Sequence, residues 1–93
     1  MTTGVDTVIP NAVMLVYPNP NKEEILYIDW KLNRREQYHA RIFDDRGSMV
    51  REQVLVISDG RSQIDIADLT SGVYILEILT GKETISEKFV RIQ

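Results

Sequence analysis

The sequence has no cysteine, one histidine, one tryptophan and only three prolines among its 93 residues. Without cysteine it has no disulfide framework and no thiolate-bound metal. The net charge is −3, from 11 basic and 14 acidic residues, so the chain lacks the basic excess of a nucleic-acid-binding domain. No apolar run approaches the length of about 18 residues that marks a membrane-spanning helix. These absences exclude several classes of protein and assign no function.

Most of the chain consists of short apolar segments that recur roughly every ten residues and are separated by turn residues, a spacing typical of all-β sandwiches and barrels. No segment keeps a helical period. We therefore expect one all-β domain of about seven strands in two sheets, with a single curled sheet as the alternative. The expected strands cover residues 13–17, 25–30, 37–43, 48–57, 63–66, 73–79 and 84–92.

Alternation along these strands predicts which side chains face the core. The side chains expected inside are Leu26, Ile28 and Trp30, then Tyr38, Ala40 and Ile42, then Ile64 and Ile66, and finally Tyr74, Leu76 and Ile78. Leu69, in the connection between two strands, is expected to close one end of the core. Tyr74 is expected to point inward with its hydroxyl on a polar partner.

Glycines and prolines predict the turns. Asp59-Gly60 is the signal of a two-residue type I′ hairpin, and the loop from Asp44 to Gly47 predicts a tight hairpin with a bulge, with Gly47 at positive φ. Gly72 is expected to allow a sharp entry into its strand. The prolines of the segment LVYPNP lack N–H donors, so we expect the chain to leave an edge strand there and cross to the second sheet at residues 25–30.

The sequence offers few candidates for catalysis. His39 shares its strand face with Gln37 and Arg41, so we expect it to face solvent, and nothing places a serine beside it. Asp65 and Asp68 are interpreted as an outward carboxylate and a turn cap rather than as a catalytic pair. No catalytic residue is expected.

Ligand sites are equally sparse. Asp44, Asp45 and Asp59 lie in loops, but their neighbours lack the repeated oxygen-ligand spacing of a calcium site. Trp30 and the tyrosines are expected to fill the core or the sheet edge more often than to stack on a sugar. We therefore expect no metal and no cofactor.

The order of five segments is more informative than any one of them: LVYPNP, ILYIDW, ARIFDDRGSMV, IDIADLTSGVYILEI and EKFVRIQ. In this order they resemble the C-terminal sorting domain of the type IX secretion system of Bacteroidetes, over roughly residues 14 to 93. The matching positions are Tyr17, Pro18, Asn19, Pro20, Asp44, Gly47, Ile64, Asp65, Leu69, Gly72, Tyr74, Lys88, Phe89, Val90 and Arg91.

The resemblance implies an immunoglobulin-like β-sandwich of seven antiparallel-dominated strands. It implies that residues 13–93 form the sorting domain and that the small, polar residues 1–12 link it to an upstream cargo protein. The outer-membrane translocon recognises such a domain and exports the cargo. In many members a sortase-like peptidase then removes the domain and attaches the cargo to the cell surface. The domain is thus an export signal that is itself exported, and not a catalyst.

The last strand has mixed faces, which suits an edge strand. We hypothesise that residues 82–93 carry the surface that the translocon recognises, with Lys88 as the charged contact, Phe89 as an apolar anchor, and Val90 and Arg91 beside them. The alternative for Lys88 is protection of the edge against unwanted pairing. The same edge is also suited to strand addition, which leaves a dimer open.

Two other functions fit the same fold, because β-sandwiches host many functions. One is an immunoglobulin-like adhesion or carbohydrate-binding module of a cell-surface protein. The other is an auxiliary stability domain of an enzyme, with no role in export. The motif that ends at Gln93 favours sorting, since a sorting domain is expected at the end of its polypeptide.

Overall fold

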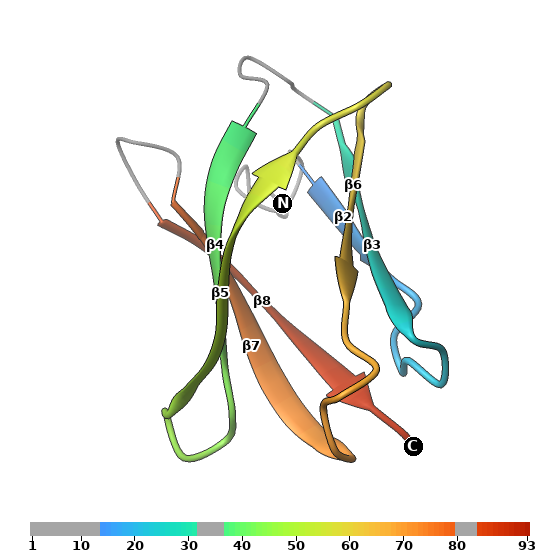
Figure 1. The fold of residues 1–93 in the computed structure, drawn as a ribbon, viewed down its shortest axis with the longest axis vertical. Coiled ribbons are helices and arrows are strands. Elements are labelled where there is room, and N and C mark those ends of the chain that lie inside the picture. Colours follow the sequence, from blue (N-terminus) through green and yellow to red (C-terminus); the bar gives the residue numbers. More distant parts are fainter. Residues whose placement is uncertain (1–13, 32–36, 80–83) are drawn as a thin grey trace, which may run out of the picture.

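A computed structural model describes residues 14–31, 37–79 and 84–93 (Figure 1). Seven strands form a three-stranded sheet, in the order β2-β3-β6, and a four-stranded sheet, in the order β5-β4-β7-β8. The strands are β2 (Met14–Tyr17), β3 (Ile25–Trp30), β4 (Gln37–Phe43), β5 (Met49–Val56), β6 (Arg61–Asp65), β7 (Gly72–Leu79) and β8 (Thr84–Arg91). All pairings between them are antiparallel. The all-β prediction with two sheets is confirmed, and the single curled sheet is wrong.

The described ranges leave some predictions aside. The linker at residues 1–12 lies outside the described residues, as do Gly81, where we expect a turn between the last two strands, and Lys82 and Glu83 of the hypothesised recognition segment. Among the described residues, no helix is long and apolar enough to cross a membrane.

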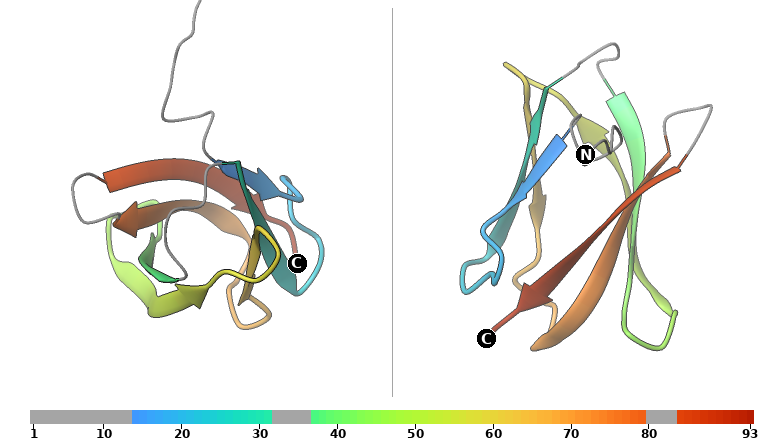
Figure 2. Two further views of the ribbon diagram at one scale, coloured as in Figure 1. Left: turned by 90° about the horizontal axis from the view of Figure 1, so that it is seen from above. Right: turned by 180° about the vertical axis from the view of Figure 1, so that it is seen from behind.

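The two sheets face each other, and the core lies between them (Figures 1 and 2). At one open side of the sandwich, β2 of the first sheet and β8 of the second run in the same direction (Figure 2). At the opposite side, the chain passes from β5 in the four-stranded sheet to β6 in the three-stranded sheet. The predicted inward faces are confirmed, because the alternating apolar side chains are buried, except that Tyr38 is only partly buried and packs against the core. The core consists of Met14, Val16, Leu26, Ile28, Trp30, Ala40, Ile42, Leu55, Ile57, Ile64, Ile66, Leu69, Tyr74, Leu76, Ile78, Ile85 and Phe89.

Both predicted hairpin turns are confirmed. Asp59 and Gly60 have φ of 53° and 76°, the left-handed pair that a type I′ turn requires. Ser58 and Arg61 exchange two backbone hydrogen bonds of 2.9 and 3.0 Å around them. Gly47 has φ of 86°, and the register of β4 and β5 shifts between Ile42 and Phe43, which is the expected bulge.

The predicted path of the chain after LVYPNP is wrong. β2 does lie at a sheet edge, but β3 pairs with it in the same sheet, with Tyr17 opposite Tyr27. The connection between them turns the chain back antiparallel, so no crossing takes place at residue 25. The Tyr17–Pro18 and Asn19–Pro20 peptide bonds are both cis. The second sheet is nevertheless contacted here, by the asparagines that stand between and after the prolines.

Candidate functional site

The segment that holds Asn19 and Asn21 binds the outer edge of β8. The Asn19 side chain donates Nδ2–H to the carbonyl of Lys88 at 3.2 Å and accepts the N–H of Val90 at 3.0 Å. Asn21 donates its backbone N–H to the Val90 carbonyl at 2.7 Å and accepts the N–H of Ile92 at 2.8 Å. We call these two residues the asparagine clamp. It joins the first and last motifs of the sequence and occupies the edge of β8 between Lys88 and Ile92.

Asn21 is fully buried, and its side chain is satisfied within its own loop. Its Oδ1 accepts the N–H of Glu23 at 2.8 Å, and its Nδ2 donates to the carbonyl of Ile25 at 3.0 Å. A buried amide needs such partners, because each unsatisfied polar group costs roughly 1–3 kcal/mol. Sequence reasoning missed Asn21, since its partners on β8 are far away in the sequence.

Arg91 is a buried structural residue, with only 4% of its surface exposed. Its Nε donates to the Leu69 carbonyl at 3.4 Å, and its Nη1 donates to the Glu23 carbonyl. The guanidinium therefore holds the β2–β3 and β6–β7 connections together at one end of the sandwich. This burial contradicts the expectation that the Arg91 side chain contacts a partner at the surface.

Phe89 is also a core residue, with 0% of its surface exposed. Its ring stacks on Tyr74 at 5.6 Å between centroids. An apolar anchor for a partner must be reachable from solvent, so this burial contradicts that role for the Phe89 side chain. Alternation places its neighbours on the other side: Lys88 is exposed and Val90 is half-buried.

Tyr74 points inward and its hydroxyl is satisfied, as predicted. The hydroxyl donates to the Thr70 carbonyl at 2.7 Å, an arrangement like the tyrosine corner of immunoglobulin-like sandwiches. Leu69 is buried beside this connection, as expected. Gly72 has no positive φ, and a Cβ there would meet only the Tyr74 ring at 3.8 Å. Neither the backbone conformation nor the space at this position therefore requires glycine.

Lys88 and Val90 face the outer side of the four-stranded sheet. Their cross-strand neighbours on β7 are Ile75 and Val73, and Ile75 in turn lies opposite Phe43 on β4. Val73 is exposed, although it is apolar. Val73 and Ile75 also line a hollow of about 540 Å³. Its other lining residues are Phe43, Asp44, Asp45, Gly47 and Glu77. Lys88 thus stands beside a hollowed apolar strip that crosses three strands.

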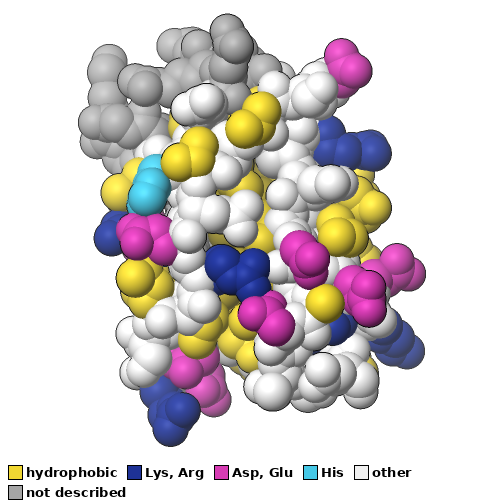
Figure 3. All heavy atoms as spheres, in the orientation of Figure 1, with side chains coloured by type: hydrophobic (Ala, Val, Ile, Leu, Met, Phe, Trp, Pro, Cys, Tyr) yellow, Lys and Arg dark blue, Asp and Glu magenta, His cyan; other side chains and the backbone are white. Residues whose placement is uncertain are grey.

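Ion pairs cover the middle of the same outer face. Arg41 Nη2 lies 2.7 Å from Glu77 Oε1, and His39 Nε2 lies 2.7 Å from Glu52 Oε2. His39 is on the outer face, as predicted. Figure 3 shows the neighbouring side of the sandwich, where β5 and β6 lie, with charged side chains of both signs among exposed apolar ones. The charges on the outer face are thus largely balanced against one another.

The aspartates serve the turns. Asp44 Oδ1 accepts the N–H groups of Arg46 and Ser48 at 3.0 and 2.9 Å. The hydrogen bond from Ser48, followed by that from Arg46, lowers the pKa of Asp44 below its usual value. Asp65 accepts the N–H of Ala67, whereas Asp68 pairs with Arg51 on β5. The carboxylates of Asp65 and Asp68 thus bind different partners, although Arg51 also donates Nη1–H to the backbone carbonyl of Asp65 at 2.6 Å.

The described residues contain no group of three or more histidine, cysteine, aspartate or glutamate side chains that could hold a metal ion. Trp30 is buried, stacks on Tyr38 at 4.7 Å and donates Nε1–H to Ser62 Oγ at 3.0 Å, so it presents no face to a sugar. Tyr17, in contrast, is only half-buried on the outer face of the three-stranded sheet, where its hydroxyl donates to Asp29 at 3.1 Å.

Residues 15–93 match the family model of the secretion system C-terminal sorting domain. The comparison with curated proteins gave no match. Among solved structures, the chain is similar to a DUF3244 family protein with an immunoglobulin-like β-sandwich fold from Bacteroides vulgatus ATCC 8482. The two are 21% identical with a TM-score of 0.67, over 90% of this chain and 88% of the other. This likeness shows the immunoglobulin-like fold.

Proposed function

The chain belongs to the secretion system C-terminal sorting domain family, and from this premise we propose that it directs an upstream cargo protein through the translocon of the type IX secretion system. Membership of the family implies export toward the outer membrane or cell surface. The match over residues 15–93 carries this proposal and favours it over an adhesion or carbohydrate-binding module.

The fate of the cargo is the second part of the proposal. A sortase-like peptidase cuts in the small, polar stretch of residues 1–12 and attaches the cargo to the cell surface. Such a peptidase needs an extended segment between two folded units, and the composition of this stretch suits that requirement. The sorting domain acts here as a substrate and an address rather than as a catalyst.

The translocon recognises Lys88 and the apolar side chains next to it. We call Lys88, Val90, Val73 and Ile75 the recognition surface. A cation beside an apolar strip offers a partner both a carboxylate contact and apolar area to bury. Phe89 supports this surface from below, because it holds β8 against the core, and it is not itself a contact.

The asparagine clamp supports a recognition surface made of side chains. Strand addition needs free N–H and C=O groups along an edge. The clamp occupies the Lys88 carbonyl, the N–H and carbonyl of Val90, and the Ile92 N–H. A partner that adds a strand to this part of β8 must first displace the clamp. The side chains of Lys88 and Val90 are available without any such displacement.

The test fuses the chain to a periplasm-directed fluorescent protein, in cells with and without the type IX translocon. Lys88→Glu is compared with Lys22→Glu, which makes the same change of charge at another exposed lysine. We expect the parent and Lys22→Glu to reach the cell surface only when the translocon is present. Lys88→Glu is expected to reduce surface fluorescence about tenfold, which corresponds to the loss of one charge-assisted contact.

Thermal unfolding of both variants controls for folding, and neither exposed substitution should change the free energy of unfolding by more than about 0.5 kcal/mol. Equal export of the two variants would show that Lys88 is not a contact. Export of the parent without the translocon would overturn the sorting function itself.

A further inference from the structure

The outer face of the three-stranded sheet carries a second organised cluster, on the side of the sandwich opposite to the recognition surface. The rings of Tyr17 and Tyr27, which face each other across β2 and β3, stack at 5.6 Å between centroids. The Arg61 guanidinium carbon lies 5.9 Å and 5.6 Å from the centroids of these two rings. Asp29 completes the cluster on β3, directly opposite Arg61. We call these four residues the Arg61 platform.

Arg61 is held in place on several sides. Its Nε donates to Asp29 Oδ1 at 2.8 Å, and the same oxygen accepts the Tyr17 hydroxyl at 3.1 Å. The hydrogen bond from Arg61 lowers the pKa of Asp29, so the carboxylate stays ionised at neutral pH. Contact with two aromatic rings and one carboxylate leaves the arginine little freedom to lose when a ligand binds.

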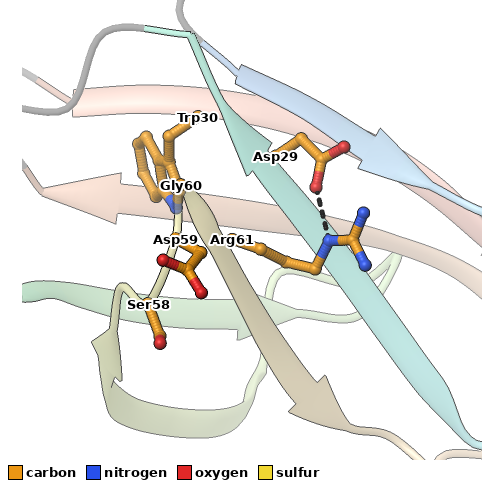
Figure 4. A pocket seen from close by; sticks show the side chains of 6 residues that line it. All are labelled: Asp29, Trp30, Ser58, Asp59, Gly60 and Arg61. Atoms are coloured by element: carbon orange, nitrogen blue, oxygen red, sulfur yellow. Dashed lines mark hydrogen bonds and ion pairs between the residues drawn. The ribbon is translucent and has the colours of Figure 1, made fainter.

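The donors that remain point outward. Figure 4 shows the Arg61 Nε facing Asp29 and the two terminal nitrogens turned away from it. Within residues 14–31, 37–79 and 84–93, neither terminal nitrogen has a hydrogen-bond partner, and the Arg61 side chain is 55% exposed. Two parallel N–H donors at the surface match the two oxygens of a carboxylate.

The Arg61 platform has an exposed apolar side chain on one side and a depression in the surface on the other. Leu15, opposite Asp29 on β2, is 53% exposed although it is a large apolar residue. A depression of about 610 Å³ lies beside Arg61, lined by Asp29, Trp30, Ser58, Asp59, Gly60 and Arg61. Tyrosine and arginine are among the side chains that contribute most at protein interfaces, and Leu15 adds exposed apolar area beside them. An isolated surface ion pair between Arg61 and Asp29 would form without the stacked tyrosine rings and without an exposed leucine beside it.

We propose that the Arg61 platform is a docking site for a protein segment that presents a carboxylate next to apolar side chains. The carboxylate accepts both terminal N–H groups of Arg61, and the apolar side chains of the segment cover Leu15 and the edges of Tyr17 and Tyr27. Asp29 takes only the Nε–H of Arg61, so the terminal N–H groups beside the exposed Leu15 are the hydrogen-bonding complement of such a segment. The sorting domain then has a protein contact on each of its two outer faces.

The test uses the purified chain and two probe peptides, acetyl-Leu-Asp-Leu-amide and acetyl-Leu-Asn-Leu-amide, followed by nuclear magnetic resonance. The aspartate peptide should shift the ring signals of Tyr17 and Tyr27 and the Nε–H signal of Arg61 in a saturable manner. The asparagine peptide should bind about tenfold more weakly, because its amide cannot accept both N–H groups.

Arg61→Lys keeps the charge and removes the fork, so it should weaken the aspartate peptide about tenfold. The matched control is Arg46→Lys, an exposed arginine in the Asp44–Gly47 turn, which should not change binding. Lys88→Glu should also leave peptide binding unchanged, so a failure of the sorting function does not affect this result.

Equal affinity of the two peptides, or no saturable shift up to about 10 mM peptide, would overturn the proposal. Inorganic phosphate is the third probe, and it tests whether the platform binds any anion. If phosphate produces the same shifts as the aspartate peptide at the same concentration, the platform is a general anion site and not a docking site for protein.

Discussion

Replacing Phe89 with alanine separates a core residue from a surface contact. The ring is 0% exposed and stacks on Tyr74. Truncation of a buried phenylalanine costs about 3–5 kcal/mol, from lost transfer free energy and from the cavity that remains. The total free energy of unfolding of a domain of this size is only about 5–15 kcal/mol. Phe89→Ala should therefore remove a large part of the stability.

The expected loss is measurable in two ways. A decrease of about 4 kcal/mol lowers Tm by about 16–32 °C in a domain of this length. Trp30 is buried and hydrogen-bonded to Ser62, so its fluorescence reports urea unfolding. Phe89→Leu keeps most of the volume and should cost about 1–1.5 kcal/mol.

The control is Lys88→Ala, the neighbouring exposed residue, which should stay within about 0.5 kcal/mol of the parent. Secretion of the Phe89 variants should follow their folded fraction and not their side-chain chemistry. If Phe89→Ala loses less than about 1 kcal/mol of unfolding free energy and still fails to be secreted, the ring is a partner contact and the assignment to the core is wrong.

Two further predictions concern the clamp and the Asp44 turn. Asn19→Ala should lower the free energy of unfolding by about 1–2 kcal/mol, because two hydrogen bonds to β8 are lost, and hydrogen exchange of the Val90 amide should accelerate; unchanged exchange would contradict the clamp. The pKa of Asp44 is lowered in the folded state, so its stabilisation is complete above the unfolded value of about 4 and is lost as pH falls through the folded value. Asp44→Asn should flatten this acid-side decline in urea titrations, whereas an unaltered pH dependence would contradict the assignment.

Local patterns predicted much of the fold correctly, because the relevant forces act over a few residues. The alternation of Leu26, Ile28 and Trp30 required one buried face, since a shift by one residue would expose all three. Asp59-Gly60 predicted its turn for a similar reason, because few residue pairs tolerate positive φ at both positions.

The errors lie where distant segments meet. Alternation placed Phe89 and Arg91 on one face of the last strand, but it did not tell which face is covered. The answer depends on Tyr74 and on the carbonyls of Glu23 and Leu69, which the chain brings together only after folding. A buried arginine that donates to backbone carbonyls has no sequence signature.

The prolines misled the prediction in a similar way. Pro18 and Pro20 lack N–H groups, so the segment was expected to leave one sheet for the other. In the structure the side-chain amide of Asn19 takes the place of a backbone amide and binds β8. A side chain that imitates the main chain cannot be recognised from the spacing of residues alone.

The asparagine clamp also has a mechanical consequence. Asn21 forms a parallel bridge with Arg91, so the segment after β2 and the end of β8 run in the same direction. A force that pulls the start of β2 away from the end of β8 acts along these strands, and the hydrogen bonds between them are stretched together in shear. They cannot open one after another, as they would when peeled. A sorting domain built in this way would resist unfolding when a force along the strands acts between the start of β2 and the end of β8.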